Sequence, residues 1–317
     1  MPARSNRIRW QSQPSAEPTG AEAQPGESLQ VSTPLLDRIG RDLTQLARQG
    51  RLKPLFGRQP ELLQLQRILL RKEKNNPLLV GAAGVGKTAL VEGLANLVAA
   101  GECAPELRPV RIVEIAPANL TAGTSLRGAF EEKLAALVSE AAQFPHLILF
   151  FDEIHTLMGA GAVSGGSLDA ANILKPALAR GEMHCIGATT PDEFDRFLKS
   201  DPASERRLEL LLLEEPTDSE TVEILHAALP GYAAHHGVEI LPEAVEAAVR
   251  LSSRHQLDRR QPDKALDLLD SACAFIRLPE PGVQPTRSEG GQPVLDAEMV
   301  GRVLAQRLHI PVDRLGG

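Results

Sequence analysis

The residues best suited to chemistry in this sequence form a glycine-rich loop that ends in a lysine and a threonine. Residues 81–88 read GAAGVGKT and match the pattern G-x-x-x-x-G-K-[S/T]. The apolar run 77–80 leads into the loop, and an Ala/Leu/Val-rich helical pattern, 89–100, follows it. In this strand–loop–helix context, glycine backbone N–H groups can surround phosphate oxygens at the positive end of a helix. The sequence therefore predicts that the chain binds a nucleoside triphosphate.

Single residues of the loop have separate expected roles. Lys87 is expected to reach the β- and γ-phosphates of ATP, and the Thr88 hydroxyl to coordinate Mg²⁺. The other expected nucleotide contacts come from the loop and the first turn of the helix: Gly81, Ala83, Gly84, Val85, Gly86 and Ala89. ATP and Mg²⁺ are therefore the predicted cofactors.

Two adjacent carboxylates at the end of a second apolar run are expected to complete a hydrolytic site. Residues 146–151 favour a buried strand, and Asp152 and Glu153 follow it directly. A buried strand that ends in acids suits a phosphate-bound metal, so we expect Asp152 to hold Mg²⁺, partly through water. Glu153 is expected to orient and deprotonate the attacking water.

Two further polar features lie at the ends of other predicted strands. Thr189 and Thr190 directly follow the strand-like run 184–188. A hydroxyl there could position the attacking water or sense the state of the nucleotide. Arg206 and Arg207 precede the last predicted strand. Such an arginine pair is either a solvated surface or, in a ring of identical subunits, a finger that reaches the γ-phosphate of the neighbour.

Strand-like runs alternate with helical patterns between residues 34 and 215, which predicts a mostly parallel sheet covered by helices on both faces. The expected strands are 77–80, 110–115, 146–151, 184–188 and 208–213. Apolar residues at helical spacing favour one helix over 35–50, stopped by Gly50, and another over 61–70. The predicted fold of this part is therefore α/β.

The pattern changes at residue 216, after which the sequence favours helices alone. Thr217 and Glu220 form a capping-box pattern that opens the region 216–317. Helices are expected near 218–229, 242–253, 262–277 and 296–308. At the other end, residues 1–33 are rich in Pro, Ser, Gln, Glu and Gly and are expected to be a disordered tail. Trp10 lies there among arginines, so the tail is either a solvated segment or a docking motif for a partner.

Composition narrows the class of protein. The 317 residues are 43% hydrophobic and 24% charged, with a net charge of −7, which is typical of a globular protein and argues against a general nucleic-acid binder. The three cysteines are widely spaced and are expected to be small buried side chains in a reduced compartment. No apolar run approaches the roughly 20 residues that span a bilayer. A cytoplasmic protein without membrane insertion is expected.

In this order, the motifs resemble the first ATPase domain of the Clp/Hsp100 disaggregases, AAA+ proteins of the ClpB, ClpC, ClpA and ClpV types. The resemblance covers residues 35 to 313. Beyond the GAAGVGKT loop, the matching segments are GRDLT at 40–44, KNNP at 74–77, VEGLA at 91–95, FDEIHT at 151–156, LKPALARGE at 174–182 and QPDKA at 261–265. The resemblance implies a three-layer αβα AAA+ domain with a parallel sheet over 34–215, followed by a small all-helical lid domain and C-terminal tail over 216–317.

The resemblance also implies roles for single residues. Thr190 stands at the position of the sensor-1 threonine. Arg206 and Arg207 match the arginine pair that acts on the neighbouring subunit, which implies a homo-oligomer, expected to be a hexameric ring. Lys264 takes the place of sensor 2 in the lid.

Other segments match the family or depart from it. Leu55 and Phe56 match the segment that lines the adenine pocket, and the double histidine at 235–236 matches a helix end, so a structural role is expected there instead of metal binding. In the family, a loop with an aromatic residue threads polypeptide through the ring. Here Ser125 and Leu126 stand at the lysine and tyrosine positions of that loop, and leucine lacks the ring and hydroxyl of tyrosine.

Three functions follow as hypotheses. The leading one is a single-ring ATPase that hydrolyses ATP between subunits and remodels or disassembles protein complexes. The alternative is an ATP-switched scaffold or regulator that assembles with a partner machine through the tail near Trp10, without threading. Leu126 and the lack of counterparts to the other family domains motivate that alternative. A nucleic-acid AAA+ protein, such as a helicase loader, is disfavoured by the acidic charge.

Overall fold

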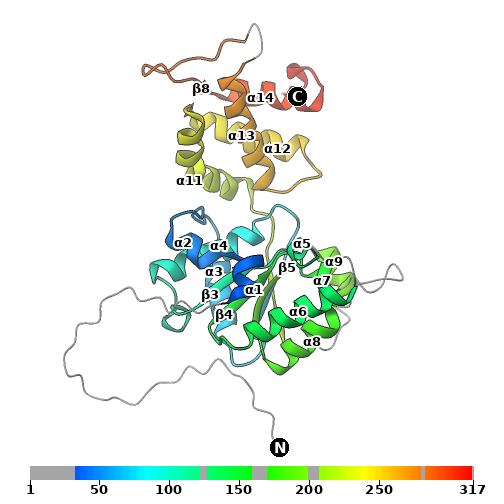
Figure 1. Ribbon diagram of the computed structural model, residues 1–317. Coiled ribbons are helices and arrows are strands. Elements are labelled where there is room, and N and C mark those ends of the chain that lie inside the picture. Colours follow the sequence, from blue (N-terminus) through cyan, green and yellow to red (C-terminus); the bar gives the residue numbers. More distant parts are fainter. Residues whose placement is uncertain (1–32, 122–126, 159–169, 199–206, 280–282, 316–317) are drawn as a thin grey trace, which may run out of the picture. The chain divides into compact units, whose positions relative to one another are not determined.

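The computed structural model describes residues 33–121, 127–158, 170–198, 207–279 and 283–315 (Figure 1). The tail with Trp10, the loop residues Ser125 and Leu126, and Arg206 lie outside these ranges. Along the described part of the chain, a layered α/β region comes first and a helical region follows (Figure 1).

A six-stranded, mainly parallel sheet forms the centre of the α/β region. Its strands, in the order in which they lie side by side, are β1 (Arg41–Asp42), β3 (Arg111–Glu114), β4 (Leu147–Phe151), β5 (His184–Thr189), β2 (Asn76–Val80) and β6 (Leu208–Leu212). β3, β4 and β5 pair in parallel, and every residue of β2, β4 and β5 is buried. Continuous apolar strands are typical of sheets covered on both faces. The predicted sheet is confirmed.

Helices cover both faces of this sheet. Figure 1 shows α3 (Gln59–Leu69) and α4 (Lys87–Ala100) on one side, and α6 (Arg127–Ala141) and α8 (Ala171–Arg180) on the other. The shorter helices of the region are α1 (Pro34–Ile39), α2 (Leu43–Arg48), the 3-10 turn η1 (Pro105–Leu107), α5 (Pro117–Thr121), α7 (His155–Met158) and α9 (Pro191–Phe197). This is the three-layer α/β/α arrangement that the sequence predicted.

The single helix predicted over residues 35–50 is wrong, because the chain breaks at Gly40 into α1 and α2. Gly40 passes so close to β3 that a Cβ there would lie 2.4 Å from Val113 Cγ1. The next two residues pair antiparallel with β3 as β1. Asp42 then accepts a hydrogen bond from Gln45 N (2.8 Å) and so caps α2. Helical spacing alone carries no information about the contact with β3.

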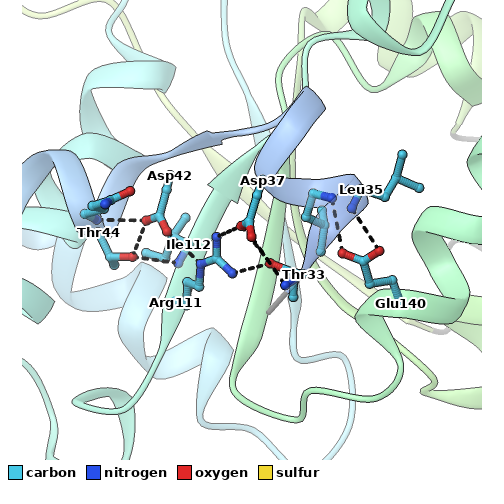
Figure 2. A network of polar contacts seen from close by, with 10 residues as sticks. Thr33, Leu35, Asp37, Asp42, Thr44, Arg111, Ile112 and Glu140 are labelled. Atoms are coloured by element: carbon cyan, nitrogen blue, oxygen red, sulfur yellow. Dashed lines mark hydrogen bonds and ion pairs between the residues drawn. The ribbon is translucent and has the colours of Figure 1, made fainter. Parts of the chain in front are cut away.

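Arg111, the first residue of β3, holds this N-terminal segment in place (Figure 2). Its guanidinium donates to Asp42 Oδ2 (2.6 Å), Asp37 Oδ1 (2.6 Å) and Thr33 Oγ1 (2.5 Å). Burial alone would raise the pKa of the Asp37 carboxyl, but the hydrogen bonds and the charge of Arg111 outweigh it and lower that pKa. At the start of α1, the Glu140 carboxylate accepts from two backbone N–H groups (3.2 Å each), which suits the positive end of a helix.

The residues after β6 form the predicted helical lid region. Its helices are α11 (Asp218–His236), α12 (Pro242–His255), α13 (Asp263–Arg277) and α14 (Ala297–Leu308), followed by the 3-10 turn η2 (Val312–Arg314). Thr217 and Glu220 form the predicted capping box at the start of α11. The region also contains a short parallel pair, β7 (Glu239–Ile240) with β8 (Val294–Leu295), which the sequence analysis missed. Two-residue strands are too short to leave a periodic signal.

The double histidine near the end of α11 has structural contacts, as predicted. His236 Nε2 lies 2.7 Å from Asp270 Oδ1 of α13, and the ring of His235 packs edge-on against that of His236. The three cysteines are buried and free, also as predicted. Burial raises the pKa of the Cys185 and Cys273 thiols to about 12, so these side chains stay protonated and behave as small apolar groups.

Contacts divide the chain into two compact units that do not follow chain order. One takes the described residues of Met1–Lys53, Leu63–Leu79 and Val91–Leu211, and the other takes those of Pro54–Leu62, Val80–Leu90 and Leu212–Gly317. The GAAGVGKT loop therefore belongs with the lid region. None of the helices in the described part of the chain combines the length and the apolar character that a bilayer crossing requires.

Candidate nucleotide-binding site

The GAAGVGKT loop, called the phosphate loop below, connects β2 to α4. Gly84 (φ +85°) and Gly86 (φ +100°) take left-handed backbone conformations that other residues rarely adopt. Lys87 opens α4, and its Nζ donates to the carbonyl oxygens of Gly81 (2.7 Å) and Ala82 (2.9 Å). The lysine ammonium therefore lies close to the backbone of the loop, where the sequence predicts phosphate oxygens.

The other predicted contact residues of the loop differ in exposure. Val85 is buried, whereas Ala83 and Ala89 are exposed. Thr88 is half-buried in the first turn of α4, directly after Lys87. The first backbone N–H groups of a helix lack partners within the helix, so this turn is suited to an anion.

The phosphate loop is packed so tightly on two sides that it requires glycine for space. A Cβ on Gly84 would lie 2.9 Å from Asp263 Cβ, at the start of α13. A Cβ on Gly81 would lie 2.5 Å from the carbonyl oxygen of Leu213, just after β6. The loop therefore combines glycines that leave no room for a side chain with one ammonium group, and this composition fits a polyphosphate.

Arg58 ties the phosphate loop to the chain that leads into the lid, a role that the sequence analysis missed. Its side chain is buried and pairs with Glu61 (2.7 Å). Nη2 donates to the carbonyl oxygens of Val85 (3.1 Å) and Glu214 (2.7 Å). An arginine directly after Gly57 was the available signal, but its backbone partners lie 27 and 156 positions away, beyond the reach of local patterns.

Leu55 and Phe56, the predicted adenine-pocket residues, belong to the same compact unit as the phosphate loop and are half-buried. Beside them, Gly57 (φ +70°) lies against α11, because a Cβ there would be 2.9 Å from Ile224 Cγ1. The segment is thus fixed by α11 and by the contacts of Arg58. Half-open apolar side chains suit a planar base, and the adenine contact stays a prediction.

Lys264, the predicted sensor-2 residue, is buried in the first turn of α13 (5% exposed). Its Nζ lies 3.6 Å from Glu215 Oε1 and donates to Gln256 O (3.4 Å). The Glu215 carboxylate also contacts Arg260 Nη1 (3.3 Å) and accepts from Gln261 N (2.8 Å). Glu215 was not among the predicted site residues, because no motif marks it.

The predicted acid pair lies at the carboxyl end of β4, in the other compact unit. Asp152 is half-buried, and its Oδ1 accepts from Glu153 N (3.1 Å). Glu153 is exposed and takes a left-handed conformation (φ +56°), which is uncommon outside glycine. Ile154 N donates to Ala188 O (2.9 Å) and so fixes the acid turn to β5. Backbone strain of this kind clusters at functional sites.

The two threonines at the end of β5 have different partners. Thr190, the predicted sensor, caps α9, and its Oγ1 lies 2.7 Å from Glu193 Oε2. Thr189 is buried, with its Oγ1 3.2 Å from His155 Nδ1, and His155 Nε2 lies 2.9 Å from Glu193 Oε1. Burial would raise the pKa of the Glu193 carboxyl, but the hydrogen bonds from Thr190 and the nearby His155 lower it. The sequence indicated both threonine hydroxyls, but not the contact of Thr189 with His155 or that of His155 with Glu193.

Arg207 lies directly before β6, at the end of the strand that is remote from the phosphate loop. Its carbonyl oxygen accepts from Asn76 Nδ2 (3.4 Å) at the start of β2, whereas Leu213 N donates to Val80 O (2.8 Å) at the end of β2. The five residues of β2, about 16 Å of strand, therefore separate the Arg207 backbone from the loop of its own chain. The role of Arg206, outside the described residues, stays a prediction.

Comparisons with known proteins agree with this arrangement. Residues 77–215 match the family described as "ATPase family associated with various cellular activities (AAA)", and residues 217–292 match the AAA lid domain. The fold and the phosphate loop thus define an AAA ATPase domain followed by its lid.

Within this class, the chain fits a Clp/Hsp100 AAA+ domain, as the motifs suggested. It is 51% identical over 254 residues to the chaperone protein ClpB of Aquifex aeolicus (strain VF5), a match that covers 80% of this chain and 25% of that protein. It is 47% identical over 247 residues to the ATP-binding subunit ClpC of the Clp protease of Staphylococcus aureus (strain USA300), covering 78% of this chain and 30% of that protein. The chain thus spans less than a third of the length of these two relatives.

Two solved structures of S. cerevisiae Hsp104 share the fold at 38% sequence identity. The Hsp104–ADP complex matches with a TM-score of 0.78, over 89% of this chain and 47% of that chain. The extended Hsp104–casein complex matches with a TM-score of 0.77, over 88% of this chain and 46% of that chain. The predicted family and fold class are therefore confirmed.

Proposed function

We propose that this chain is a Clp-type ring ATPase that hydrolyses ATP and uses the cycle to remodel or disassemble protein complexes. The observation that carries the proposal is the packing of Asp263, at the start of lid helix α13, against Gly84 of the phosphate loop. A ligand that alters the loop would shift the equilibrium position of the lid, and such a shift can do work on a partner. The similarity to ClpB, ClpC and Hsp104 supports remodelling and does not favour an ATP-switched scaffold.

The residues of the site have separate roles in this proposal. Bound ATP with Mg²⁺ supplies the phosphoanhydride bond and the metal that offsets its charge. Lys87 and the loop N–H groups hold phosphate oxygens, while Thr88 and Asp152 offer the hard oxygen ligands that Mg²⁺ prefers. Glu153 orients the attacking water and takes its proton. Thr190 places its hydroxyl at the end of β5, the strand that lies between β4 and β2 in the sheet.

The arginine pair is proposed to act on the nucleotide of the neighbouring subunit in a hexameric ring. The length of β2 between Arg207 and the phosphate loop of its own chain supports action in trans over action in cis. An arginine supplied by a neighbour is a recurring device for stabilising charge during phosphoryl transfer. Arg206, next to it in sequence, is proposed to share the role.

A protein is the proposed substrate class, because one of the matching Hsp104 structures is a complex with casein. Docking of a partner through the tail near Trp10 stays part of the proposal. Along the sequence, we propose boundaries at residues 1–33 for the tail, 34–215 for the AAA domain and 216–317 for the lid.

The catalytic assignment is tested by Glu153→Gln, with phosphate release as the measurement. We expect hydrolysis to fall about a hundredfold or more, because the amide cannot take a proton, while the Kd for fluorescent ADP changes little. Glu106→Gln, on η1, is the control and should hydrolyse at the parent rate. Unchanged hydrolysis in Glu153→Gln would show that the general base is elsewhere.

The ring assignment is tested by measuring particle mass with and without ATP, on the full chain and on a chain that lacks residues 1–33. We expect mass to rise to a closed oligomer with ATP in both. If the chain stays a monomer under all conditions, Arg206 and Arg207 have no neighbouring phosphate to contact and the ring proposal is wrong.

A further inference from the structure

Glu215 lies where the chain enters the lid, and its carboxylate contacts three groups of the lid. It lies 3.6 Å from Lys264 Nζ and 3.3 Å from Arg260 Nη1, and it accepts from Gln261 N (2.8 Å). Two of these groups are cations. The carboxylate is therefore the counter-charge that the structure provides for the predicted sensor-2 lysine.

The backbone beside Glu215 is fixed to the phosphate loop. The carbonyl oxygen of Glu214 accepts from Arg58 Nη2 (2.7 Å), and the same nitrogen donates to Val85 O (3.1 Å) inside the loop. The side chain of Glu214 is exposed. Residues 214 and 215 thus have different contacts. The backbone of Glu214 is bonded to the arginine that holds the loop, and the side chain of Glu215 contacts the cations of the lid.

Burial makes this charge pairing consequential for Lys264. Only 6% of its side chain is exposed, so an ammonium without a nearby anion would bear a large desolvation cost. The start of α13 also carries the Asp263 carboxylate, but Arg259 Nη2 lies 2.8 Å from it. A polyphosphate bound at the loop would bring further anionic oxygens to this helix start, because Asp263 lies against Gly84. Such oxygens would compete with the Glu215 carboxylate for Lys264.

We propose that Glu215 is a positioning residue that holds Lys264 and Arg260 back from nucleotide phosphates, which would otherwise attract them. By this competition, Glu215 sets the nucleotide affinity of the site. This inference rests on the proposed function, because it takes the phosphate loop as the nucleotide site. When Lys264 exchanges the carboxylate for phosphate oxygens, the lid loosens its hold on residue 215 and tightens its hold on the nucleotide.

The test is Glu215→Gln in the full chain, with the Kd for fluorescent ADP as the first measurement. The amide keeps an oxygen that can accept from Gln261 N but removes the charge. In this variant, Lys264 is buried without its counter-anion and bears an uncompensated desolvation cost. An anionic ligand would offset that cost, whereas in the parent chain the Glu215 carboxylate already offsets it. We expect the Kd to fall about fivefold, the scale of one partly exposed ion pair.

Glu214→Gln is the matched control, because it makes the same change of charge one residue earlier on an exposed side chain. Its Kd should stay within a factor of about two of the parent value. In a Lys264→Ala background, Glu215→Gln should also change the Kd by less than about a factor of two, because the buried cation is gone and the remaining partner, Arg260, is 52% exposed. An equal drop in both glutamine variants would assign the effect to net charge and overturn the proposal.

Thermal unfolding gives a second readout that a purely structural role would not produce. Glu215→Gln should unfold at a lower temperature than the parent chain without nucleotide, and the gap should narrow at saturating ADP. A gap of the same size in both conditions, or an unchanged or higher Kd, would overturn the inference. If the parent chain itself does not bind ADP, the proposed function fails first, so the two failures are distinguishable.

Discussion

Asp263, the first residue of α13, approaches Gly84 so closely that a Cβ on the glycine would lie 2.9 Å from the Asp263 Cβ. The phosphate loop and the lid therefore meet at a point with no space for a side chain. A residue of any other type at position 84 must displace either the loop or the helix. This contact makes the loop and the lid depend on each other sterically, before any ligand is considered.

Gly84→Ala is expected to weaken nucleotide binding and stability together. The alanine would bear about 1 kcal/mol for a left-handed backbone (φ +85°) and a further 1–3 kcal/mol, roughly, for overlap with Asp263. Urea unfolding and the Kd for fluorescent ADP are the measurements. Gly101→Ala is the matched control, because Gly101 is also left-handed (φ +73°) but a Cβ there meets nothing within 4 Å. Equal effects of the two substitutions would mean that the loop and the lid do not touch.

Thr190→Ala is expected to lower stability by about 1 kcal/mol through loss of the helix cap and also to slow hydrolysis. Thr217→Ala provides an unusually close comparison, because Thr217 makes the same capping box with Glu220 at the start of α11. We expect Thr217→Ala to lower stability alone. Phosphate release at equal occupancy and urea unfolding separate the two effects. If both variants hydrolyse ATP at the parent rate, Thr190 is only a cap.

Arg58→Ala is expected to destabilise the chain by roughly 2–4 kcal/mol, because the carbonyl oxygens of Val85 and Glu214 lose their donor in a buried site. Arg58→Lys should lose less, since an ammonium keeps the charge but lacks the planar fork. Arg71→Ala is the control, because Arg71 is 46% exposed and its pair with Glu209 is worth at most about 1 kcal/mol. Urea unfolding at neutral pH is the measurement, and a change below 1 kcal/mol in Arg58→Ala would contradict the buried geometry.

Asp37 is expected to stabilise the folded chain at neutral pH and to lose this contribution in acid. Its folded-state pKa is lowered from 3.8, so its contribution is complete above pH values near 4 and is lost as the pH falls through the lowered value. Its side chain is 49% exposed, so the contribution should be no more than about 1 kcal/mol. Asp37→Asn should therefore be less stable than the parent chain at pH 7, with the difference shrinking below pH 4. Asp313→Asn, on an exposed residue of η2, should change stability by no more than about 0.5 kcal/mol at pH 7.

Much of the fold could be predicted because its signals are local. The strands of the sheet interior are continuous apolar runs, and the lid begins at a capping box that is complete within four residues, Thr217 to Glu220. The prediction over 35–50 failed where a distant residue decides the outcome. Gly40 must pass Val113 closely, and that contact breaks a pattern that is otherwise helical.

The candidate site shows the same division. Lys87 and Thr88 belong to the GAAGVGKT motif, and Asp152 and Glu153 directly follow an apolar run. Their positions at the start of α4 and after β4 could therefore be predicted. The residues that connect the loop to the lid could not, because they act through backbone atoms or through side chains far along the chain. Arg58 contacts a carbonyl 156 positions away, and Glu215 contacts α13 with no motif of its own.

The two compact units are each made of segments that alternate along the sequence, so a single cut in the chain does not separate them. A fragment that stops at residue 215 would keep every letter of the GAAGVGKT motif yet lose Asp263, which borders Gly84, and Lys264, Arg260 and Gln261, which surround Glu215. The excised piece would expose a carboxylate and a loop edge to water. The region after residue 215 looks like a separate domain in the linear sequence, but its helix α13 packs against the phosphate loop at Gly84.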